Sequence, residues 1–497
     1  MVPQVFANTG LLDTDPDNGL STDFTILIKI HDLDLPTRRQ LEKKFKYFLP
    51  HAFHVPAYKL GRWDGCVSFF SMGGVTYLNF LDEIIPILSE HYIVTVKDKR
   101  KKQTFDFIEV TDTIHEKLVW PKGHTHKGQN IILRDYQVDI VNQFLSEPQC
   151  LQEIATGAGK TLITATLSYS VEPYGRTIVI VPNKDLVTQT EDDYKNLGLD
   201  AGVYFGDRKE FGKIHTICTW QSLNSMDKRY KDGEIDIGLK TFTKDVICVI
   251  VDEVHMAKAD VLRKLLTGPF ATIPIRWGLT GTIPKEEWQF ASLKASLGNV
   301  INRLSAADLQ KQEVLANCEI NIIQTQDIVA YLNYQSELTY LTTNENRIDY
   351  LAGLFKDIAK DGNTLILVDR IKAGKMIQER LGDESVFISG SVKSADRRKQ
   401  YSEVQDSDNK IIVATYGVAS IGINIPRIFN LVLLEPGKSF IRVIQSIGRG
   451  IRKAQDKDFV NVWDITSSAK FSKRHLTKRK KFYAEAKYPY SVQKITI

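Results

Sequence analysis

Short apolar runs, most of them without polar alternation, constrain the fold of this chain more than any other feature. A strand of this kind is buried on both faces, as in a parallel sheet covered by helices. Helix-length segments lie between the runs, and the rhythm begins near residue 126 and restarts after about residue 315. We therefore expect two doubly wound α/β domains in tandem. The runs lie at residues 177–181, 215–218, 246–251, 365–368, 411–414, 431–434 and 460–463.

Residues 1–125 follow a different pattern, which predicts a small α+β domain. Residues 24–30 alternate between apolar and polar side chains, as a half-buried strand does. Thr37-Arg38-Arg39-Gln40 has the spacing of a capping box and predicts a helix over 37–48. Residues 80–92 repeat with helical period and predict a second helix.

The same domain contains a turn signal at Asp64-Gly65, which predicts a β-hairpin with strands at 58–60 and 67–70. Next to this turn, Arg62 and Trp63 combine a positive charge with a stacking surface, which suits unpaired nucleotides. A purely structural interpretation stays open, in which Trp63 packs in a small core and Asp64-Gly65 only turns the chain.

Positive charge is concentrated at the C-terminal end of the sequence. The net charge is only +5, from 65 Lys and Arg against 60 Asp and Glu. In residues 470–497, however, nine residues are Lys or Arg and one, Glu485, is acidic, and residues 97–102 hold five basic residues. Such clusters suit a polyanion, although a solvated face or a localisation signal fits equally well. We expect domains at 1–125, 126–312 and 313–468, followed by a basic tail at 469–497.

The composition excludes several classes of protein. No apolar run approaches the roughly 20 residues that a membrane-spanning helix needs, and the first residues do not resemble a signal peptide. Five widely spaced cysteines without a Cys-x-x-Cys pair argue against a disulfide framework or a zinc site. A cytoplasmic protein that does not bind membranes is expected.

A glycine-rich segment between an apolar strand and a helical run predicts a phosphate-binding loop. In Thr156-Gly157-Ala158-Gly159-Lys160-Thr161, the glycines let backbone N–H groups converge on phosphates at a helix N-terminus. Lys160 is expected to reach the β- and γ-phosphate oxygens, and the hydroxyl of Thr161 to bind Mg²⁺. Ile154 replaces the first glycine of the general pattern, so a glycine-rich turn with a surface lysine is the alternative.

Two adjacent carboxylates, Asp252 and Glu253, follow the apolar run 246–251. Asp252 is expected to hold Mg²⁺, and Glu253 to orient and deprotonate the attacking water. His255 has two interpretations, as a relay toward the second domain or as a structural histidine. An Asp-Glu pair at a strand end is often only a strand meeting solvent, but the phosphate loop upstream favours catalysis.

Arg449 and Arg452 are three residues apart in the predicted helix 439–453, so both can point toward one anion. An arginine of this kind neutralises charge on a γ-phosphate and is worth about 10³–10⁵ in rate. The alternative is an arginine pair on a solvated helix face. Gly448 and Gly450 each cost a helix about 1 kcal/mol relative to alanine, which suggests close packing against another segment.

These motifs, in this order, resemble those of a superfamily 2 helicase of the Asp-Glu-x-His type over residues 130–465. The resemblance implies two RecA-like motor domains, with ATP and Mg²⁺ as cofactors. It implies that Gln137 reads adenine, that Gly422 lies in the fifth motif beside the nucleotide, and that His255, Thr280, Thr282 and Gln445 couple hydrolysis to movement. Asn424 departs from the aspartate common in the fifth motif. The implied nucleic-acid contacts are Pro182, Asn183, Thr219, Gln221, Ser389 and Thr415.

Within this superfamily the chain is similar to phage helicases of recombination and branch migration, which implies action on forks, D-loops and Holliday junctions. The leading hypothesis is an ATP-dependent DNA helicase or translocase, with recombination or single-strand-binding proteins as possible partners. An RNA helicase stays open because no residue signals recognition of a 2′-hydroxyl. So does an NTP-gated binding or annealing factor whose basic segments do the main work.

Overall fold

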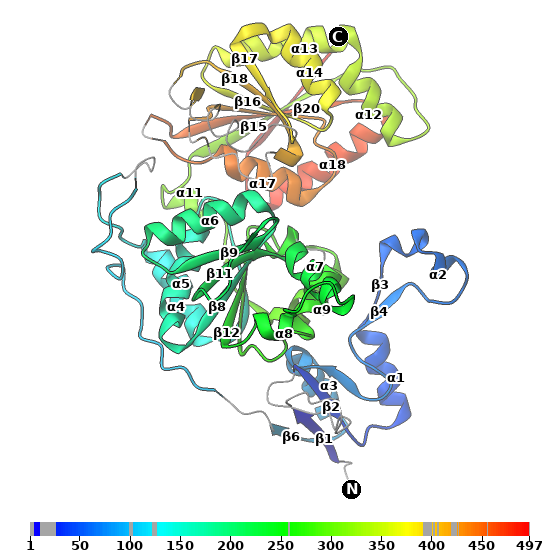
Figure 1. The fold of residues 1–497 in the computed structure, drawn as a ribbon. Helices are drawn as coiled ribbons and strands as arrows, with labels where there is room; N and C mark the ends of the chain where they lie inside the picture. Colours follow the sequence, from blue (N-terminus) through cyan, green and yellow to red (C-terminus); the bar gives the residue numbers. More distant parts are fainter. Residues whose placement is uncertain are drawn as a thin grey trace. The chain divides into compact units, whose positions relative to one another are not determined.

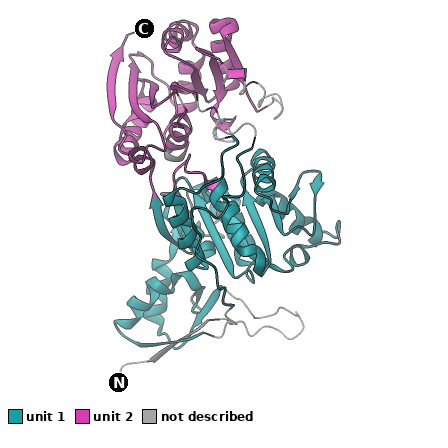
Figure 2. Cartoon of the chain, turned by 90° about the vertical axis from the view of Figure 1, so that its left-hand side faces the viewer, with its two compact units in different colours: residues 1–153, 161–303 teal, residues 154–160, 304–497 magenta. Residues whose placement is uncertain are grey.

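The computed structural model describes residues 4–9, 26–98, 103–121, 127–256, 259–390, 400, 403–404, 407–418, 425, 427–454 and 456–496. Contacts divide the chain into two compact units (Figure 2). Unit 1 comprises Met1–Glu153 and Thr161–Arg303, and unit 2 comprises Ile154–Lys160 and Leu304–Ile497. In the residues described, no helix is both long and apolar enough to cross a membrane.

The first part of unit 1 is a small α+β domain, as expected. A four-stranded sheet has the order β5-β2-β1-β6, in which β1 runs antiparallel to β2 and parallel to β6. A separate two-stranded sheet consists of β3 and β4. The elements are β1 (Gln4–Thr9), β2 (Leu27–Ile30), α1 (Leu35–Lys44), β3 (Lys46–Phe48), α2 (Pro56–Lys59), β4 (Cys66–Ser68), β5 (Val75–Tyr77), α3 (Leu81–Ser89) and β6 (Ile93–Asp98), with 3-10 turns at Pro50–His54 and Leu78–Phe80.

Two local predictions for this domain were wrong. The first helix is capped by Asp34, whose Oδ1 accepts a 2.7 Å hydrogen bond from the Thr37 N–H, so it starts and ends earlier than predicted. The expected strand at 58–60 is part of the helical turn α2, because Pro56 has the φ that a first helical turn requires. Strand β4 therefore pairs with β3 and not with residues 58–60.

The small domain packs firmly on helix α10 (Glu287–Leu297) of the same unit. Its aromatic core, which includes Phe45, Phe69 and Phe80, contacts Ala291 and Ala295 on one face of α10. Beside this contact the Lys294 ammonium is buried and is bound by the carboxylates of Asp82 at 2.9 Å and Glu83 at 2.6 Å. A buried charge is tolerated only when it is paired in this way.

The rest of unit 1 is built on an eight-stranded sheet of order β10-β9-β11-β8-β12-β13-β7-β14. Strands β9, β11, β8, β12, β13 and β7 pair in parallel, and β10 runs antiparallel to β9. The strands are β7 (Gln149–Ile154), β8 (Arg176–Val181), β9 (Ala201–Phe205), β10 (Arg208–Lys209), β11 (His215–Thr219), β12 (Val246–Val251), β13 (Ile275–Thr280) and β14 (Asn299–Leu304).

Helices cover both faces of this sheet (Figure 1). Strand β8 shows why, because Ile178 and Ile180 enter one core while Val179 and Val181 enter the other. Helices α5 and α6 line one core and α7 to α10 the other. The helices are α4 (Asp135–Ser146), α5 (Lys160–Val171), α6 (Lys184–Asn196), α7 (Trp220–Lys231), α8 (Leu239–Phe242) and α9 (Ala259–Thr267), with 3-10 turns at Glu172–Tyr174 and Val254–Met256.

Unit 2 contains a seven-stranded sheet of order β17-β18-β16-β19-β20-β15-β21, and every pairing in it is parallel. Helices lie on both sides of this sheet as well (Figure 1). The two sheets confirm the expected pair of doubly wound domains. The strands are β15 (Asn317–Thr325), β16 (Thr364–Val368), β17 (Ser385–Ile388), β18 (Ile411–Thr415), β19 (Asn430–Leu434), β20 (Phe459–Ser467) and β21 (Tyr490–Ile495). The helices are α11 (Ala306–Lys311), α12 (Tyr334–Thr343), α13 (Glu345–Ala359), α14 (Ile371–Leu381), α17 (Phe440–Gly450) and α18 (Lys470–Glu485), with a 3-10 turn at Gly382–Glu384.

The segment predicted as a basic tail is part of the fold of unit 2. Residues 470–485 form helix α18, and β21 follows it as the strand beside β15 at one edge of the sheet. The prediction failed because one arginine of the basic run, Arg479, is fully buried and forms two hydrogen bonds with the carboxylate of Asp464, at 2.8 and 2.9 Å. Composition alone does not reveal such a partner.

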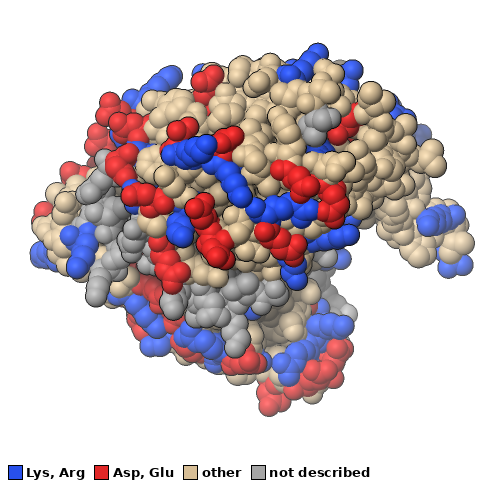
Figure 3. All heavy atoms as spheres, turned by 90° about the horizontal axis from the view of Figure 1, so that it is seen from above, with Lys and Arg blue, Asp and Glu red and all other residues tan. Residues whose placement is uncertain are grey.

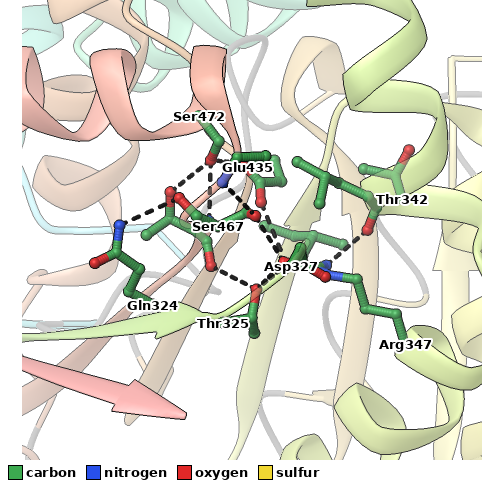
Figure 4. A network of polar contacts seen from close by, with 12 residues as sticks. Gln324, Thr325, Asp327, Thr342, Arg347, Glu435, Ser467 and Ser472 are labelled. Carbon is green, nitrogen blue, oxygen red and sulfur yellow. Dashed lines mark hydrogen bonds and ion pairs between the residues drawn. The ribbon is translucent and has the colours of Figure 1, made fainter. Parts of the chain in front are cut away.

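Buried polar groups in unit 2 form a connected network (Figure 4). The guanidinium of Arg347 lies 3.3 Å from the carboxylate of Glu435 and 3.6 Å from that of Asp327. Glu435 also accepts a 2.6 Å hydrogen bond from Ser472 on α18, and Asp327 accepts one of 2.6 Å from Ser467 at the end of β20. The network thus joins three segments that are distant in sequence.

Glu435 should make the stability of unit 2 depend on pH. Burial raises its pKa to about 7, against the opposing effect of Arg347. The folded state therefore binds the proton more tightly than the unfolded state does, so the stabilisation is complete below pH 4.5 and is lost as the pH rises through 7. Relative to Glu435→Gln, the wild-type chain should lose about 3 kcal/mol of unfolding free energy over this range. Urea unfolding of both proteins from pH 4 to 8 measures this, and equal pH profiles would contradict it.

Candidate functional site

The predicted phosphate loop connects β7 to α5. Gly157 and Gly159 have φ angles of +94° and +83°, which side chains with a Cβ rarely adopt. A Cβ added to Gly157 would also lie 2.7 Å from Leu315 Cδ2. The ammonium of Lys160 lies 3.4 Å from the Ile154 carbonyl oxygen, so its side chain folds back over the loop. Thr161 follows in the first turn of α5.

Asp252 and Glu253 lie at the carboxyl end of β12, as predicted. The Asp252 N–H bonds to the Ile180 carbonyl of β8 at 2.9 Å, which fixes the strand end. Asp252 Oδ1 accepts a 2.8 Å hydrogen bond from the Glu253 N–H. Glu253 has a φ of +49°, an uncommon and strained conformation for a residue other than glycine. The strain sets the direction of its carboxylate relative to the sheet.

Three of the four residues predicted to couple hydrolysis to movement, His255, Thr280 and Thr282, lie together in unit 1. His255 Nδ1 is 2.6 Å from Thr280 Oγ1 and 3.4 Å from the Glu253 carboxylate. The Thr280 hydroxyl donates to the Thr282 carbonyl at 2.9 Å, and the Thr282 N–H bonds back to Thr280 Oγ1 at 3.2 Å. His255 thus contacts both segments, and its role as a relay toward the second domain stays a prediction. We name Glu253, His255, Thr280 and Thr282 the carboxylate–threonine network.

Gln137 lies in the first turn of α4 and is buried. Its Oε1 accepts a 3.0 Å hydrogen bond from the Arg134 N–H, which orients the side-chain amide at the start of the helix. The local structure thus gives Gln137 a capping contact, while its role in reading adenine stays a prediction.

Four predicted nucleic-acid contacts in unit 1, Pro182, Asn183, Thr219 and Gln221, lie at the carboxyl ends of β8 and β11 or just beyond them. Asn183 caps α6 by accepting the Leu186 N–H at 3.0 Å, and Thr219 caps α7 by accepting the Ser222 N–H at 3.2 Å. Gln221 donates to the Pro182 carbonyl at 3.2 Å, so the two loops touch. Within the described residues, the buried Nδ2 of Asn183 has no hydrogen-bond partner. In unit 2, Ser389 is buried just after β17 and Thr415 ends β18.

Arg62 and Trp63 occupy the loop between α2 and β4. Arg62 is exposed, whereas Trp63 is half-buried and donates from its indole N–H to the Cys66 carbonyl at 2.9 Å. Trp63 therefore contributes to the structure of the loop, as the structural interpretation expects. Part of its ring stays accessible, so a contact with nucleotides stays a prediction.

The arginine pair differs from the prediction. Helix α17 ends at Gly450, and Arg452 lies beyond it in an extended bridge with Leu315, so the two arginines do not share a helix face. The Ile451 carbonyl accepts the Ala316 N–H at 2.9 Å, and this pairing ends the helix. The side chain of Arg449 and residue Gly422 lie outside the described residues. Gln445 is buried within α17.

The two glycines of α17 pack closely, as their cost to a helix suggested. A Cβ on Gly450 would lie 3.0 Å from a Leu431 methyl group of β19. One on Gly448 would lie 3.2 Å from Thr156 Cβ in the loop segment that belongs to the same unit.

Glu153 was missed by the sequence analysis. It is the penultimate residue of β7, and its carboxylate accepts the Ile283 N–H at 3.1 Å, close to Thr282 of the carboxylate–threonine network. An acidic residue next to a phosphate loop was the available signal. The Gly281 N–H also donates to the Glu253 carboxylate at 3.4 Å. A pattern of side chains in the sequence does not predict such a contact with a backbone group.

The chemistry of these groups fits a nucleotide with Mg²⁺. Two glycines with positive φ and a helix N-terminus form a cradle for phosphate oxygens. Thr161 and Asp252 supply hydroxyl and carboxylate oxygens, the hard ligands that Mg²⁺ prefers. Among the residues that the structure describes, no group of three His, Cys, Asp or Glu side chains is placed to hold a metal ion. This is compatible with Mg²⁺, which is usually held by one or two carboxylates together with substrate phosphates.

Two family descriptions match the chain. The type III restriction enzyme res subunit family matches residues 130–285, and the helicase conserved C-terminal domain matches residues 343–454. The first range contains the phosphate loop and the carboxylate–threonine network, and the second contains Arg449 and Arg452.

Curated relatives carry helicase names. The ATP-dependent DNA helicase UvsW of Enterobacteria phage T4 is 25% identical over 453 residues, which cover 86% of each chain. A Rad25 protein of Haloarcula marismortui, described as a putative DNA 3'-5' helicase, is 26% identical over 343 residues, or 66% of this chain and 52% of that protein. Among solved structures, a fragment of an HsdR subunit of a type I restriction enzyme from Vibrio vulnificus YJ016 covers 95% of this chain and 84% of its own, with a TM-score of 0.55 at 16% identity. That last likeness concerns the fold alone.

The ordered motifs, the two matched domains and the curated relatives lead to one conclusion. The chain is a superfamily 2 helicase of the Asp-Glu-x-His type, an enzyme that couples ATP hydrolysis to the unwinding of nucleic acid, and it resembles UvsW.

Proposed function

We propose that this helicase acts on DNA, and on branched DNA in particular, as a translocase that migrates or unwinds forks, D-loops and Holliday junctions. The choice of DNA is supported by the names of its relatives, which include DNA helicases and a DNA translocase. The observation that carries the mechanism is the carboxylate–threonine network. The Glu253 carboxylate accepts the Gly281 N–H and lies 3.4 Å from His255, which in turn contacts Thr280.

In the proposed chemistry, the loop glycines and Lys160 hold the triphosphate, and Gln137 contacts the adenine. Thr161 and Asp252 hold Mg²⁺, which neutralises phosphate charge when bound. Glu253 orients the attacking water and accepts its proton. Its positive φ and its contact with the Gly281 N–H support this role, because a base must be held in one direction.

The second motor domain contributes Arg449 and Arg452, which we propose neutralise charge on the γ-phosphate. We propose Gln445 for coupling and Gly422 for nucleotide binding. Hydrolysis would then depend on the two motor domains closing around the nucleotide, which makes chemistry and movement interdependent. Strand contacts come from Pro182, Asn183, Thr219 and Gln221 in the first domain, supported by the buried Asn183 Nδ2 that has no partner within the described residues. Ser389 and Thr415 contribute from the second.

The small N-terminal domain supports branched substrates. It is fixed to α10 by an apolar core and by the buried Lys294 ion pairs, so it moves with the first motor domain as one body. Arg62 and the partly exposed ring of Trp63 then offer a second nucleic-acid contact at a constant distance from the motor. A DNA junction presents more than one arm, and two fixed contacts suit it better than one.

Glu253→Gln should lower DNA-stimulated ATP hydrolysis by about 10²- to 10⁴-fold, because the amide cannot accept the proton from water. Lys160→Ala should abolish stimulation by weakening phosphate binding. The measurement is steady-state ATPase with single strands, duplexes, forks and four-way junctions, each in DNA and in RNA. Forked and four-way DNA should stimulate the wild-type enzyme most.

Lys356→Ala is the matched control, because this exposed lysine lies on α13, away from every proposed contact. Equal stimulation by RNA and forked DNA would reject DNA as the substrate class. Glu253→Gln protein that unwinds at the parental rate would reject the hydrolytic role.

Thr280→Val should separate hydrolysis from unwinding. The substitution removes the hydroxyl that joins His255 to the Thr282 segment but leaves Lys160, Asp252 and Glu253 in place. Base pairs opened per ATP hydrolysed should fall several-fold, while Thr280→Ser, which keeps the hydroxyl, should stay close to the parental value. If ATPase and unwinding fall in equal proportion, the network serves hydrolysis only.

A further inference from the structure

Helix α18 carries its positive charge on one exposed face. Lys470, Lys473, Arg474, Lys478 and Lys481 are all exposed, and at 3.6 residues per turn they span about 140° of the helix circumference. The opposite face is buried and consists of Ser472, His475, Leu476, Arg479 and Tyr483. We name the five exposed residues the α18 basic stripe.

The stripe is held in a fixed orientation. Asp464, buried in β20, binds Arg479 through two hydrogen bonds and accepts a third of 2.7 Å from the Tyr483 hydroxyl. At the start of the helix, the carboxylate of Glu337 accepts the N–H groups of Phe471 and Ser472 at 3.0 and 2.7 Å. Both ends of α18 are therefore anchored through buried groups. Rotation of the helix would break these hydrogen bonds to Asp464 and Glu337.

These charges do not stabilise the helix that carries them. The first turn of α18 contains no acidic residue, although the positive end of a helix dipole favours acids there and disfavours Lys and Arg. Lys470 and Arg474 are four residues apart, as are Arg474 and Lys478, and like charges at this spacing repel. Within the residues described, the five make no ion pair with an acidic side chain. The stripe therefore suits an anionic partner outside the fold.

The arrangement also differs from an ordinary charged surface. The face of the molecule drawn in Figure 3 carries acidic and basic side chains interspersed. Along the stripe, by contrast, basic residues continue from Lys470 to Lys481, a length of about 16 Å. This matches the rise of about five phosphates along one DNA strand.

The chemistry of the helix favours nucleic acid over a membrane. A helix that lies on a membrane presents large apolar side chains to the lipid beside its basic residues. Here Leu476 and Tyr483 face the protein core, and the exposed face between the stripe residues offers Thr477. We propose that the α18 basic stripe binds the sugar–phosphate backbone of nucleic acid, outside the helicase motifs and without base specificity. This proposal rests on the proposed function, because it needs nucleic acid as the substrate.

Deleting residues 470–497 would not test this proposal, because it would also remove a buried helix and a strand of the sheet. Point substitutions in the full-length chain avoid the problem. The stripe variant is K473Q/R474Q/K478Q, in which glutamine keeps helix propensity. The matched control is K356Q/K372Q/K375Q, which removes three exposed charges from α13 and α14 of the same unit.

Fluorescence anisotropy with two DNA duplexes of unrelated sequence, across a range of salt concentrations, is the measurement. Log affinity falls as log salt rises, and each lost phosphate contact should make this slope less steep by about 0.7 to 0.9. The slope of the stripe variant should therefore be less steep than that of the wild type by about 2 to 3. Its affinity near 0.1 M salt should fall on the order of ten- to a hundredfold for both duplexes. The control should stay within about twofold of wild type, and the thermal midpoints of all three proteins should agree.

Equal losses in the stripe and control variants would overturn the proposal, as would a loss confined to one duplex sequence. Unchanged affinity and slope in the stripe variant, with DNA-stimulated ATPase intact, would reject the stripe and leave the proposed function standing. Polyglutamate binding that depends on the stripe, without any change for DNA, would assign the surface to an acidic protein instead. A wild-type chain that neither binds DNA nor responds to it would reject both proposals.

Discussion

Burial of two parallel sheets on both faces is the constraint on which the rest of the structure depends. Alternate residues of β8 enter opposite cores, so the strand cannot slip by one residue without exchanging every buried contact. All six parallel strands of the first sheet therefore end in register at one edge. Glu153, Asp252 and Thr280 lie at the ends of three neighbouring strands, and their proximity results from the sheet and not from local sequence.

Much of this arrangement could be predicted because the relevant signals are local and strong. An apolar run of six residues followed by Asp252-Glu253 predicts a buried strand with carboxylates at its end. A glycine-rich segment between a strand and a helix predicts a phosphate-binding loop. The failures have equally physical causes. Asp34 and Thr37 are both good capping residues, and Pro36, which suits a first helical turn, agrees with the cap at Asp34 that the structure shows. Arg452 lies outside the predicted helix because it pairs with Leu315, which is more than a hundred residues away in sequence.

The C-terminal segment shows the limit of charge patterns most clearly. Nine basic residues look alike in the sequence, yet one of them, Arg479, is fully buried against Asp464, and its neighbours face outward. Asp464, the one acidic residue of strand β20, was the available hint. The geometry of the carboxylate–threonine network was likewise beyond prediction, since the positive φ of Glu253 and its bond to a backbone N–H depend on the neighbouring strand.

The position of β21 has a consequence for handling this protein. This strand covers the outer side of β15, a nine-residue strand that pairs with β20 on its other side. If β21 were trimmed or displaced by a fusion partner, β15 would present a long row of unpaired backbone groups flanked by Ile320 and Ile322. Such an unpaired strand edge can pair with a second molecule, so shortened versions of the chain would be prone to aggregate even with Asp252 and Glu253 in place.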